Sequence, residues 1–286
     1  MTPIAASGPN AEQIRYWNEQ AGPVWLANQA ALDRRLARFG ELALASAGVA
    51  AGERVLDVGC GCGDTALELA RRVGASGAVV GVDVSAPMLE RARERARAAG
   101  AANLRFESGD AQSHAFEPER FDLVFSRFGV MFFADPPAAF ANLSRALRRG
   151  GRLAFVCWQE VARNPWLGLP TRAIAAHVAL PPPAAPDAPG PFAFADALRT
   201  AGILERGGFE EVALAPVETS LLVGSTLDEA VEFALTVGPA ATLLRDAPRD
   251  TVARARAAVR EALAPHVTAE GVLLGASVWV ATARRN

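Results

Sequence analysis

The stretch Val55-Leu56-Asp57-Val58-Gly59-Cys60-Gly61-Cys62-Gly63-Asp64 decides the fold of this chain. An apolar run with an acid at its third position breaks into glycines at every second residue, and an apolar pattern with helical spacing begins at Ala66. This order predicts a strand, a tight turn and a helix. Glycines let the backbone adopt positive φ and pass close beneath a ligand, and the first amides of the following helix point above the turn. The turn is therefore predicted to be a ligand cradle.

The glycine spacing distinguishes two classes of ligand for such a turn. A dinucleotide fingerprint has the spacing G-x-G-x-x-G, whereas Gly59, Gly61 and Gly63 follow G-x-G-x-G. Asp57 stands two residues before the first glycine, where a carboxylate would repel a pyrophosphate and attract an ammonium group. The pattern D-x-G-x-G-x-G resembles motif I of the class I S-adenosylmethionine-dependent methyltransferases. The resemblance implies a cofactor whose amino-acid end lies on this loop.

Two acids further along the chain extend the resemblance. Asp83 ends a predicted strand 20 residues after the last loop glycine, and a carboxylate offers two acceptor oxygens to the vicinal hydroxyls of a ribose. Asp110 and Ala111 follow another predicted strand, where the family reads the adenine amino group. By resemblance Val84 and Met88 pack on the adenine or ribose, although helix core is an equally good interpretation of Met88. The matched pieces cover roughly residues 53–158 in the correct order.

The composition narrows the class of protein without naming a reaction. The 286 residues suffice for one large domain, or one domain with a cap, and 51% of them are hydrophobic. A formal net charge of -2 does not suggest a nucleic-acid partner. No apolar run approaches the roughly 18 residues of a membrane span. The N-terminus Met1-Thr2-Pro3-Ile4 lacks a signal-peptide pattern, so a cytoplasmic protein is expected.

Few side chains are available for proton transfer. The chain contains no lysine, which excludes mechanisms that need a Schiff-base or general-base lysine. A protein base is needed only if the acceptor is a hydroxyl that must lose its proton. His177 is the first candidate for that base and Tyr16 the second, and a structural role stays open for both. His114 is interpreted as a side chain on a loop, not as a catalyst.

Metal chemistry is not expected. The C-x-C of Cys60 and Cys62 could suggest a soft metal, but both occupy positions between loop glycines where small residues are needed for steric reasons. Cys157, in a later predicted strand, has no reason in the sequence to meet them, and all three are expected to be reduced thiols. Ser126 and Arg127 follow the fourth predicted strand, where magnesium would need clustered acids.

The resemblance implies an α/β fold with a Rossmann-like seven-stranded sheet in the order 3-2-1-4-5-7-6, the last strand antiparallel, helices on both faces and a helical cap. Strands are expected at 54–58, 78–82, 104–107, 121–125, 152–158, from 208 onward and at 276–283. Helices are expected at 11–20, 24–47, 64–73, 87–99, 137–147, 164–180 and 195–207, with two more between 225 and 268. Residues 1–50 would be N-terminal helices that close over the site. Residues 51–286 would be the methyltransferase domain, with cap insertions at 159–194 and 220–275.

The site is expected at the carboxyl ends of the strands, because open α/β sheets bind ligands there. The resemblance implies these cofactor-binding residues: Asp57, Gly59, Cys60, Gly61, Gly63, Asp83, Val84, Met88, Asp110, Ala111, Ser126, Arg127, Tyr16 and Trp17. A largely apolar acceptor pocket is expected from Phe128, Met131, Phe132, Trp158 and Trp166. Arg127 could also orient an anionic or carbonyl group of the acceptor or stabilise the cap.

These features predict methyl transfer from S-adenosylmethionine to a small, mostly apolar acceptor, with S-adenosylhomocysteine as product and no metal. The ubiquinone/menaquinone-biosynthesis-like methyltransferases are the group that the chain resembles. A sulfonium is already an activated methyl donor, so proximity, orientation and desolvation can supply most of the catalysis. A non-catalytic S-adenosylmethionine-binding sensor or regulatory protein, and an enzyme that uses the cofactor for other chemistry, stay open. The glycine spacing and Asp57 oppose an NAD-dependent oxidoreductase. Neither the acceptor nor the oligomeric state follows from the sequence.

Overall fold

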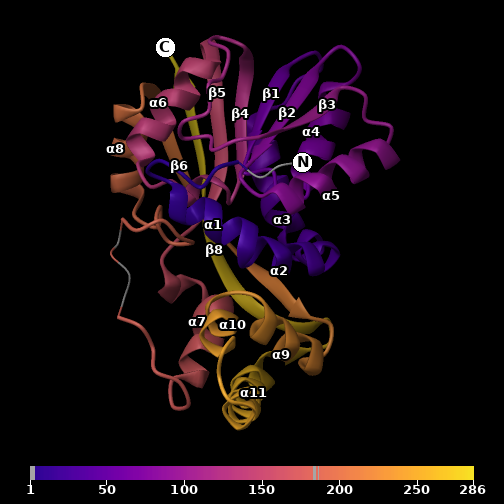
Figure 1. The fold of residues 1–286 in the computed structure, drawn as a ribbon, viewed down its shortest axis with the longest axis vertical. Helices are drawn as coiled ribbons and strands as arrows, with labels where there is room; N and C mark the ends of the chain where they lie inside the picture. Colours follow the sequence, from indigo (N-terminus) through magenta and orange to yellow (C-terminus); the bar gives the residue numbers. More distant parts are fainter. Residues whose placement is uncertain (1–3, 183–184, 186) are drawn as a thin grey trace. The chain divides into compact units, whose positions relative to one another are not determined.

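A computed structural model describes residues 4–182, 185 and 187–286 (Figure 1). The chain forms two compact units. The first comprises Met1–Cys157, Asp187–Pro216 and Trp279–Asn286, and the second comprises Trp158–Pro186 and Val217–Val278. Two long strands, β6 (Phe209–Gly224) and β8 (Gly271–Arg285), contribute residues to both units.

An open sheet with the strand order β3-β2-β1-β4-β5-β8-β6 organises the first unit (Figure 1). Its parallel strands are β1 (Arg54–Val58), β2 (Ala78–Asp83), β3 (Leu104–Ser108), β4 (Phe121–Arg127) and β5 (Leu147–Trp158). Leu56 of the central strand pairs with Val80 on one side and Val124 on the other. The predicted strand order is confirmed, with β8 in the place of the seventh strand. The sheet gains one more strand because the short β7 (Val267–Thr268) pairs with β8.

Helices follow the parallel strands in the alternation that the sequence predicts. They are α4 (Asp64–Val73), α5 (Ala86–Ala98), α6 (Pro136–Ala146) and α8 (Ala197–Arg206). α6 begins at Pro136, one residue before its predicted start: the Asp135 side chain accepts a hydrogen bond from the Ala138 amide at 3.1 Å, and Pro136 takes the first helical position. Phe140 of α6 is fully buried and contacts the rings of Phe155 and Phe194.

Three N-terminal helices precede the sheet: α1 (Ala11–Glu19), α2 (Ala21–Ala27) and α3 (Gln29–Ala47). The single helix predicted at 24–47 is wrong. The helix breaks at Asn28, whose backbone and side-chain N–H groups both donate to the Val24 carbonyl, because a short amide side chain competes for backbone acceptors. Asn18 attaches α1 to the end of β2: its amide donates to the Val84 carbonyl at 2.9 Å and accepts from the Ala86 amide at 3.0 Å.

The second unit contains α7 (Pro165–Ile174), α9 (Leu227–Thr236), α10 (Pro239–Leu244) and α11 (Arg249–Leu263). The helix predicted at 164–180 ends early, at Ile174. The two helices predicted between 225 and 268 are three, because Gly238 and Pro248 interrupt the pattern. Residues 183, 184 and 186 of the cap insertion predicted at 159–194 lie outside the described part. Within the described part of the chain, no helix is long and apolar enough to cross a membrane.

Candidate active site

The loop between β1 and α4 takes the tight conformation that its glycines predict. Gly59, Gly61 and Gly63 have φ of 66°, 53° and 82°, a region that side chains rarely adopt. A Cβ on Gly59 would lie 2.6 Å from the Cα of Gly129, and a Cβ on Gly129 would lie 2.8 Å from the Cα of Gly59. This close approach joins the loop after β1 to the loop after β4.

Several amides of this loop bond protein acceptors. The Gly59 and Cys60 amides both donate to the Val82 carbonyl, at 2.9 and 3.2 Å. The Gly61 amide donates to Asp83 Oδ2 at 2.8 Å, and the Gly63 amide donates to the Cys60 carbonyl at 2.9 Å. These four amides therefore do not form the anion-binding cradle that a pyrophosphate needs.

Asp57 places a buried carboxylate beneath the loop. Its Oδ2 accepts a hydrogen bond from Thr65 Oγ at 2.7 Å, whereas its Oδ1 is buried without a hydrogen-bond partner. Burial raises the pKa of Asp57 to about 7, and the Thr65 hydrogen bond and the charge of Arg127 oppose the rise. An unpartnered buried carboxylate oxygen is costly in the free protein. It fits a ligand that brings a cation, such as the ammonium group of an amino acid.

Asp83 accepts hydrogen bonds from backbone amides and keeps some acceptor capacity. Oδ2 accepts from the Gly61 amide and Oδ1 from the Ser85 amide, each at 2.8 Å. Burial raises the pKa of Asp83, against these backbone hydrogen bonds. The Val84 amide is a third backbone donor to this carboxylate, and each carboxylate oxygen can accept about two hydrogen bonds, so acceptor capacity remains for ribose hydroxyls. Met88 is buried below the loop, with its Cε 2.9 Å from where a Cβ on Gly61 would lie.

Asp110 and Ala111 are buried just after β3. The Ala111 carbonyl accepts from Asn142 Nδ2 at 3.0 Å, which ties the loop after β3 to α6. The same Asn142 nitrogen donates to the His114 carbonyl at 2.9 Å. The His114 ring lies 3.2 Å from Glu107 Oε2, so this histidine contacts an acid of β3. Side chains of α6 and of β3 therefore both contact the loop after β3.

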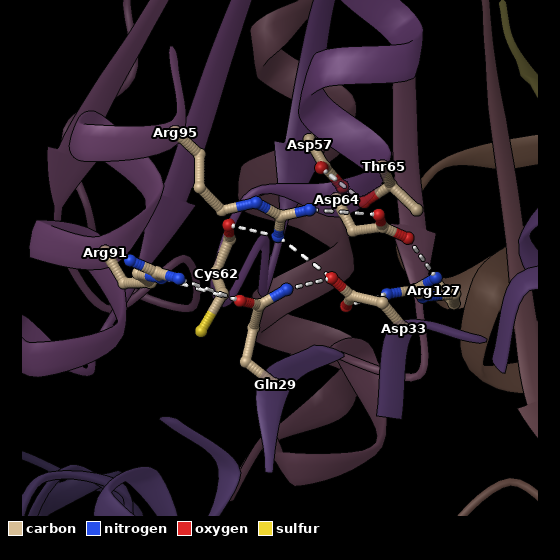
Figure 2. A network of polar contacts seen from close by, with 9 residues as sticks. All are labelled: Gln29, Asp33, Asp57, Cys62, Asp64, Thr65, Arg91, Arg95 and Arg127. Atoms are coloured by element: carbon tan, nitrogen blue, oxygen red, sulfur yellow. Dashed lines mark hydrogen bonds and ion pairs between the residues drawn. The ribbon is translucent and has the colours of Figure 1, made fainter. Parts of the chain in front are cut away.

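Two arginines and two acids form a network beside the glycine loop (Figure 2). Arg127, at the end of β4, donates to Asp64 Oδ2 at 2.8 Å and lies 3.8 Å from Asp33 of α3. Arg95 of α5 contacts the same two acids, at 3.0 Å for Asp33 and 3.3 Å for Asp64, and donates to the Cys62 carbonyl at 2.9 Å. Burial and the Asp64 charge raise the pKa of Asp33 against both arginines. The network therefore attaches α3 to the glycine loop, and the guanidinium group of Arg127 is engaged by the two acids.

Replacement of Arg127 by methionine is expected to lower the free energy of unfolding by about 2–3 kcal/mol. The arginine is only 12% exposed, and its loss leaves the Asp33 and Asp64 carboxylates with one arginine between them. The cost stays below the roughly 3–5 kcal/mol of a fully buried pair, because Asp64 is partly exposed. Denaturant unfolding measures the change. Arg148→Met is the matched control: its bridge to Asp122 is exposed, so a loss under about 1 kcal/mol is expected. Equal losses for both variants would contradict a special role for the network.

The remaining residues at the end of β4 face neighbouring backbone and aromatic rings. Ser126 Oγ donates to the Val58 carbonyl at 2.8 Å and accepts from the Gly129 amide at 3.1 Å. Its hydroxyl thus joins the ends of β1 and β4. Phe128 has a positive φ of 62° and packs edge-on against Phe39 of α3 at 5.7 Å.

An aromatic cluster joins α1 and α2 to the short helix η1 (Val130–Phe132). Trp17 lies at its centre, with the rings of Tyr16 and Trp25 each 5.7 Å away and the ring of Phe132 at 5.0 Å, all edge to face. Met131 is 2% exposed and belongs to the core. Trp17 thus contacts Phe132, one of the residues predicted for the acceptor pocket.

Other predicted residues belong to the second unit. Trp158 and Trp166 contact each other with ring centres 4.9 Å apart. His177 lies in a turn beyond the end of α7. Their predicted roles in the pocket and in proton transfer therefore stay predictions, as does the role of residues 1–50 in closing over the site. No local pattern indicates Asn10, Asp33 or Arg95 as site residues, because their partners are 31 to 100 positions away in the chain.

The three cysteines are free and buried. Burial raises the pKa of Cys60 well above its ordinary value and that of Cys62 to about 12, so both thiols stay protonated. Throughout residues 4–182, 185 and 187–286, no group of three or more His, Cys, Asp or Glu side chains could hold a metal ion. Cys60 and Cys62 therefore pack within the loop.

Comparison with known proteins identifies the family. A family described as "Methyltransferase domain" matches residues 55–151. Aklanonic acid methyltransferase DauC of Streptomyces sp. (strain C5) is 40% identical over 104 residues, which are 36% of this chain and 47% of that protein. Nocamycin O-methyltransferase of Saccharothrix syringae is 33% identical over 219 residues, 68% of this chain and 78% of that protein. The solved structure of the YcgJ protein from Bacillus subtilis superposes with a TM-score of 0.59 at 18% identity and covers 86% of this chain and 97% of that one.

The relatives are matched over different shares of their own length. The first of the curated relatives are matched over about half of their length, 47% and 43%, whereas the nocamycin enzyme is matched over most of its length. The solved structure shares the fold. The chain belongs to the class I S-adenosylmethionine-dependent methyltransferases, whose cofactor the β1–α4 loop fits.

Proposed function

We propose that this protein transfers the methyl group of S-adenosylmethionine to a small, mostly apolar acceptor by in-line displacement and without a metal. The unpartnered carboxylate oxygen of Asp57 beneath the glycine loop carries the proposal. It suits the amino-acid end of this cofactor and disfavours the pyrophosphate of a dinucleotide. The similarity to nocamycin O-methyltransferase over most of that protein supports a small-molecule acceptor.

Each part of the cofactor has a candidate partner in the first unit. Asp57 would hold the ammonium group, Asp83 the two ribose hydroxyls, and Asp110 with the Ala111 amide the adenine edge. When bound, the cofactor supplies an activated methyl group on a cationic sulfur. Gly59, Gly61 and Gly63 keep the loop free of side chains, so that the ligand can approach the backbone closely. These residues would bind and orient the methyl donor. Holding the donor in a reactive position raises its effective molarity toward the acceptor.

The acceptor side would be apolar and would exclude water. Phe132 and the Trp17 cluster supply aromatic surface beside the end of β4, and a desolvated site strengthens the electrostatic contacts around the reacting groups. His177 and Tyr16 remain the candidates for a base if the acceptor is a hydroxyl.

The proposal is tested by binding followed by turnover. Calorimetry with S-adenosylmethionine and with NAD should show binding of the first alone. Transfer of a labelled methyl group should then be found with at least one member of a panel of quinols, phenols and amines, and a chelator should leave the rate unchanged. Binding of NAD alone would overturn the family's cofactor for this chain. Binding without turnover on any acceptor would favour a sensor, and loss of turnover with the chelator would overturn the metal-free mechanism.

A further inference from the structure

Asn10 occupies the position before α1 without capping it. Its side chain makes no hydrogen bond to the first turn of the helix, although asparagine is among the preferred N-cap residues. Instead Asn10 Nδ2 donates to Asp110 Oδ1 at 3.1 Å, across 100 positions of sequence. Asn10 is 5% exposed and Asp110 is 8% exposed, so the bond is buried. The side chain of Asn10 is therefore hydrogen-bonded to the loop after β3.

The contact with Asp110 fixes how the Asn10 amide is oriented. A carboxylate accepts hydrogen bonds but does not donate them, so the amide nitrogen of Asn10 must face Asp110. The carbonyl oxygen then points elsewhere, and it is buried without a hydrogen-bond partner. One helical turn along α1, Gln13 Oε1 is also buried without a partner. Two unpartnered acceptors on one side of α1 indicate a donor that the protein itself does not supply.

Asp110 has one acceptor position left beside this amide. Its Oδ1 accepts from Asn10 and from the Gln112 amide, both at 3.1 Å, which uses both lone pairs. Its Oδ2 accepts from Ser113 Oγ at 3.3 Å, which leaves one lone pair. The pair Asn10–Asp110 therefore presents two open acceptor positions, one on the Asn10 carbonyl oxygen and one on Asp110 Oδ2.

We infer that Asn10 is a specificity-determining residue that reads the exocyclic amino group of adenine together with Asp110. An exocyclic amino group has two hydrogens to donate, which matches two open acceptors. Hypoxanthine carries a carbonyl oxygen at that position, and it would leave both acceptors unpaired and bring a third acceptor against them. The inference rests on the proposed function, because it assigns one end of the same cofactor. It also follows that α1, which carries Tyr16 and Trp17, is attached to the adenine site through Asn10.

The test compares two ligands that differ only at this edge of the base. Calorimetry measures binding of S-adenosylhomocysteine and of S-inosylhomocysteine to the wild-type protein and to Asn10→Ala. The substitution is expected to weaken binding of the adenine ligand about tenfold, the size of one buried hydrogen bond, and not to weaken binding of the inosine ligand. The preference for adenine should therefore fall about tenfold.

Asn142→Ala is the matched control, because Asn142 holds the same loop through the Ala111 and His114 carbonyls. Loss of this brace is expected to weaken both ligands equally and to leave the preference unchanged. Equal weakening of both ligands in Asn10→Ala would show that Asn10 only positions the loop, and would overturn the inference. An unchanged preference would do the same. Failure of the wild-type protein to bind either ligand would instead overturn the proposed function, and the assignment of Asn10 with it.

Discussion

Asp83→Ala is expected to weaken binding of S-adenosylhomocysteine by about 100-fold or more. The carboxylate accepts from the amides of Gly61, Ser85 and Val84 and keeps acceptor capacity for the ribose hydroxyls. Two hydrogen bonds to a charged acceptor contribute about 1.5–3 kcal/mol each, and about 3 kcal/mol corresponds to roughly 100-fold in affinity. Calorimetry of the wild-type and variant proteins measures the loss. An unchanged dissociation constant would show that the ribose lies elsewhere.

A ligand without the 2′-hydroxyl separates recognition of the ribose from bracing of the loop. The wild-type protein should bind 2′-deoxy-S-adenosylhomocysteine less well than the parent ligand, and Asp83→Ala should bind both equally. A preference that persists in the variant would contradict a direct role of Asp83. Asp122→Ala is the control, because Asp122 also accepts a strand amide, that of Arg54 at 2.7 Å, but stands at the start of β4. It should cost stability and leave both affinities unchanged.

Binding of S-adenosylhomocysteine is expected to become roughly 20-fold weaker between pH 7.5 and pH 5.5. In the free protein the pKa of Asp57 is raised to about 7, so the carboxyl is mostly protonated at the lower pH. An ammonium group favours the ionised form, so binding releases a proton and affinity rises with pH through this range. Asp57→Asn should bind at least about tenfold more weakly at pH 7.5 and should lose this pH dependence. A wild-type affinity that is constant from pH 5.5 to 7.5 would contradict the assignment.

Two further measurements test the same carboxyl. Thr65→Val removes a hydrogen bond that lowers the pKa of Asp57, so the midpoint of the pH profile should move upward. The raised pKa also acts on folding. A carboxyl whose pKa is higher in the folded than in the unfolded state contributes stability below its unfolded pKa and loses it as pH rises through about 7. Asp57→Asn should therefore raise the melting temperature of the ligand-free protein more at pH 8 than at pH 5.

The parallel half of the fold could be predicted closely because its signals are local. The bounds of β1 and α4 agree with those expected from the sequence, since apolar runs, turn glycines and helical spacing are all visible within a few residues. The order of the strands needed the family resemblance. β5 begins at Leu147 and not at the predicted residue 152. Residues 147–151 form an irregular start of the strand, where its pairing with β4 shifts register between Phe121 and Leu123.

Less of the site could be predicted, because its contacts join distant residues. The acids Asp57, Asp83 and Asp110 stand at strand ends and were selected for that reason. The pattern of α3 shows Asp33 only as a polar position, and nothing near it in the sequence indicates Arg95 or Arg127 as partners. Asn10 stands directly before α1, but its side-chain amide donates to Asp110 and not to the first turn of the helix. Partner choice in such networks depends on the folded arrangement and not on spacing along the chain.

The contact between Gly59 and Gly129 limits how this protein can evolve or be engineered. Each glycine occupies the space that a Cβ on the other would need, and the obstructing atoms are backbone, which cannot rotate away. A side chain at one position therefore cannot be accommodated by a smaller residue at the other, since no residue is smaller than glycine. Single substitutions offer no route to a bulkier loop here. New acceptor specificities must arise from residues outside this pair, such as the aromatic side chains that follow β4.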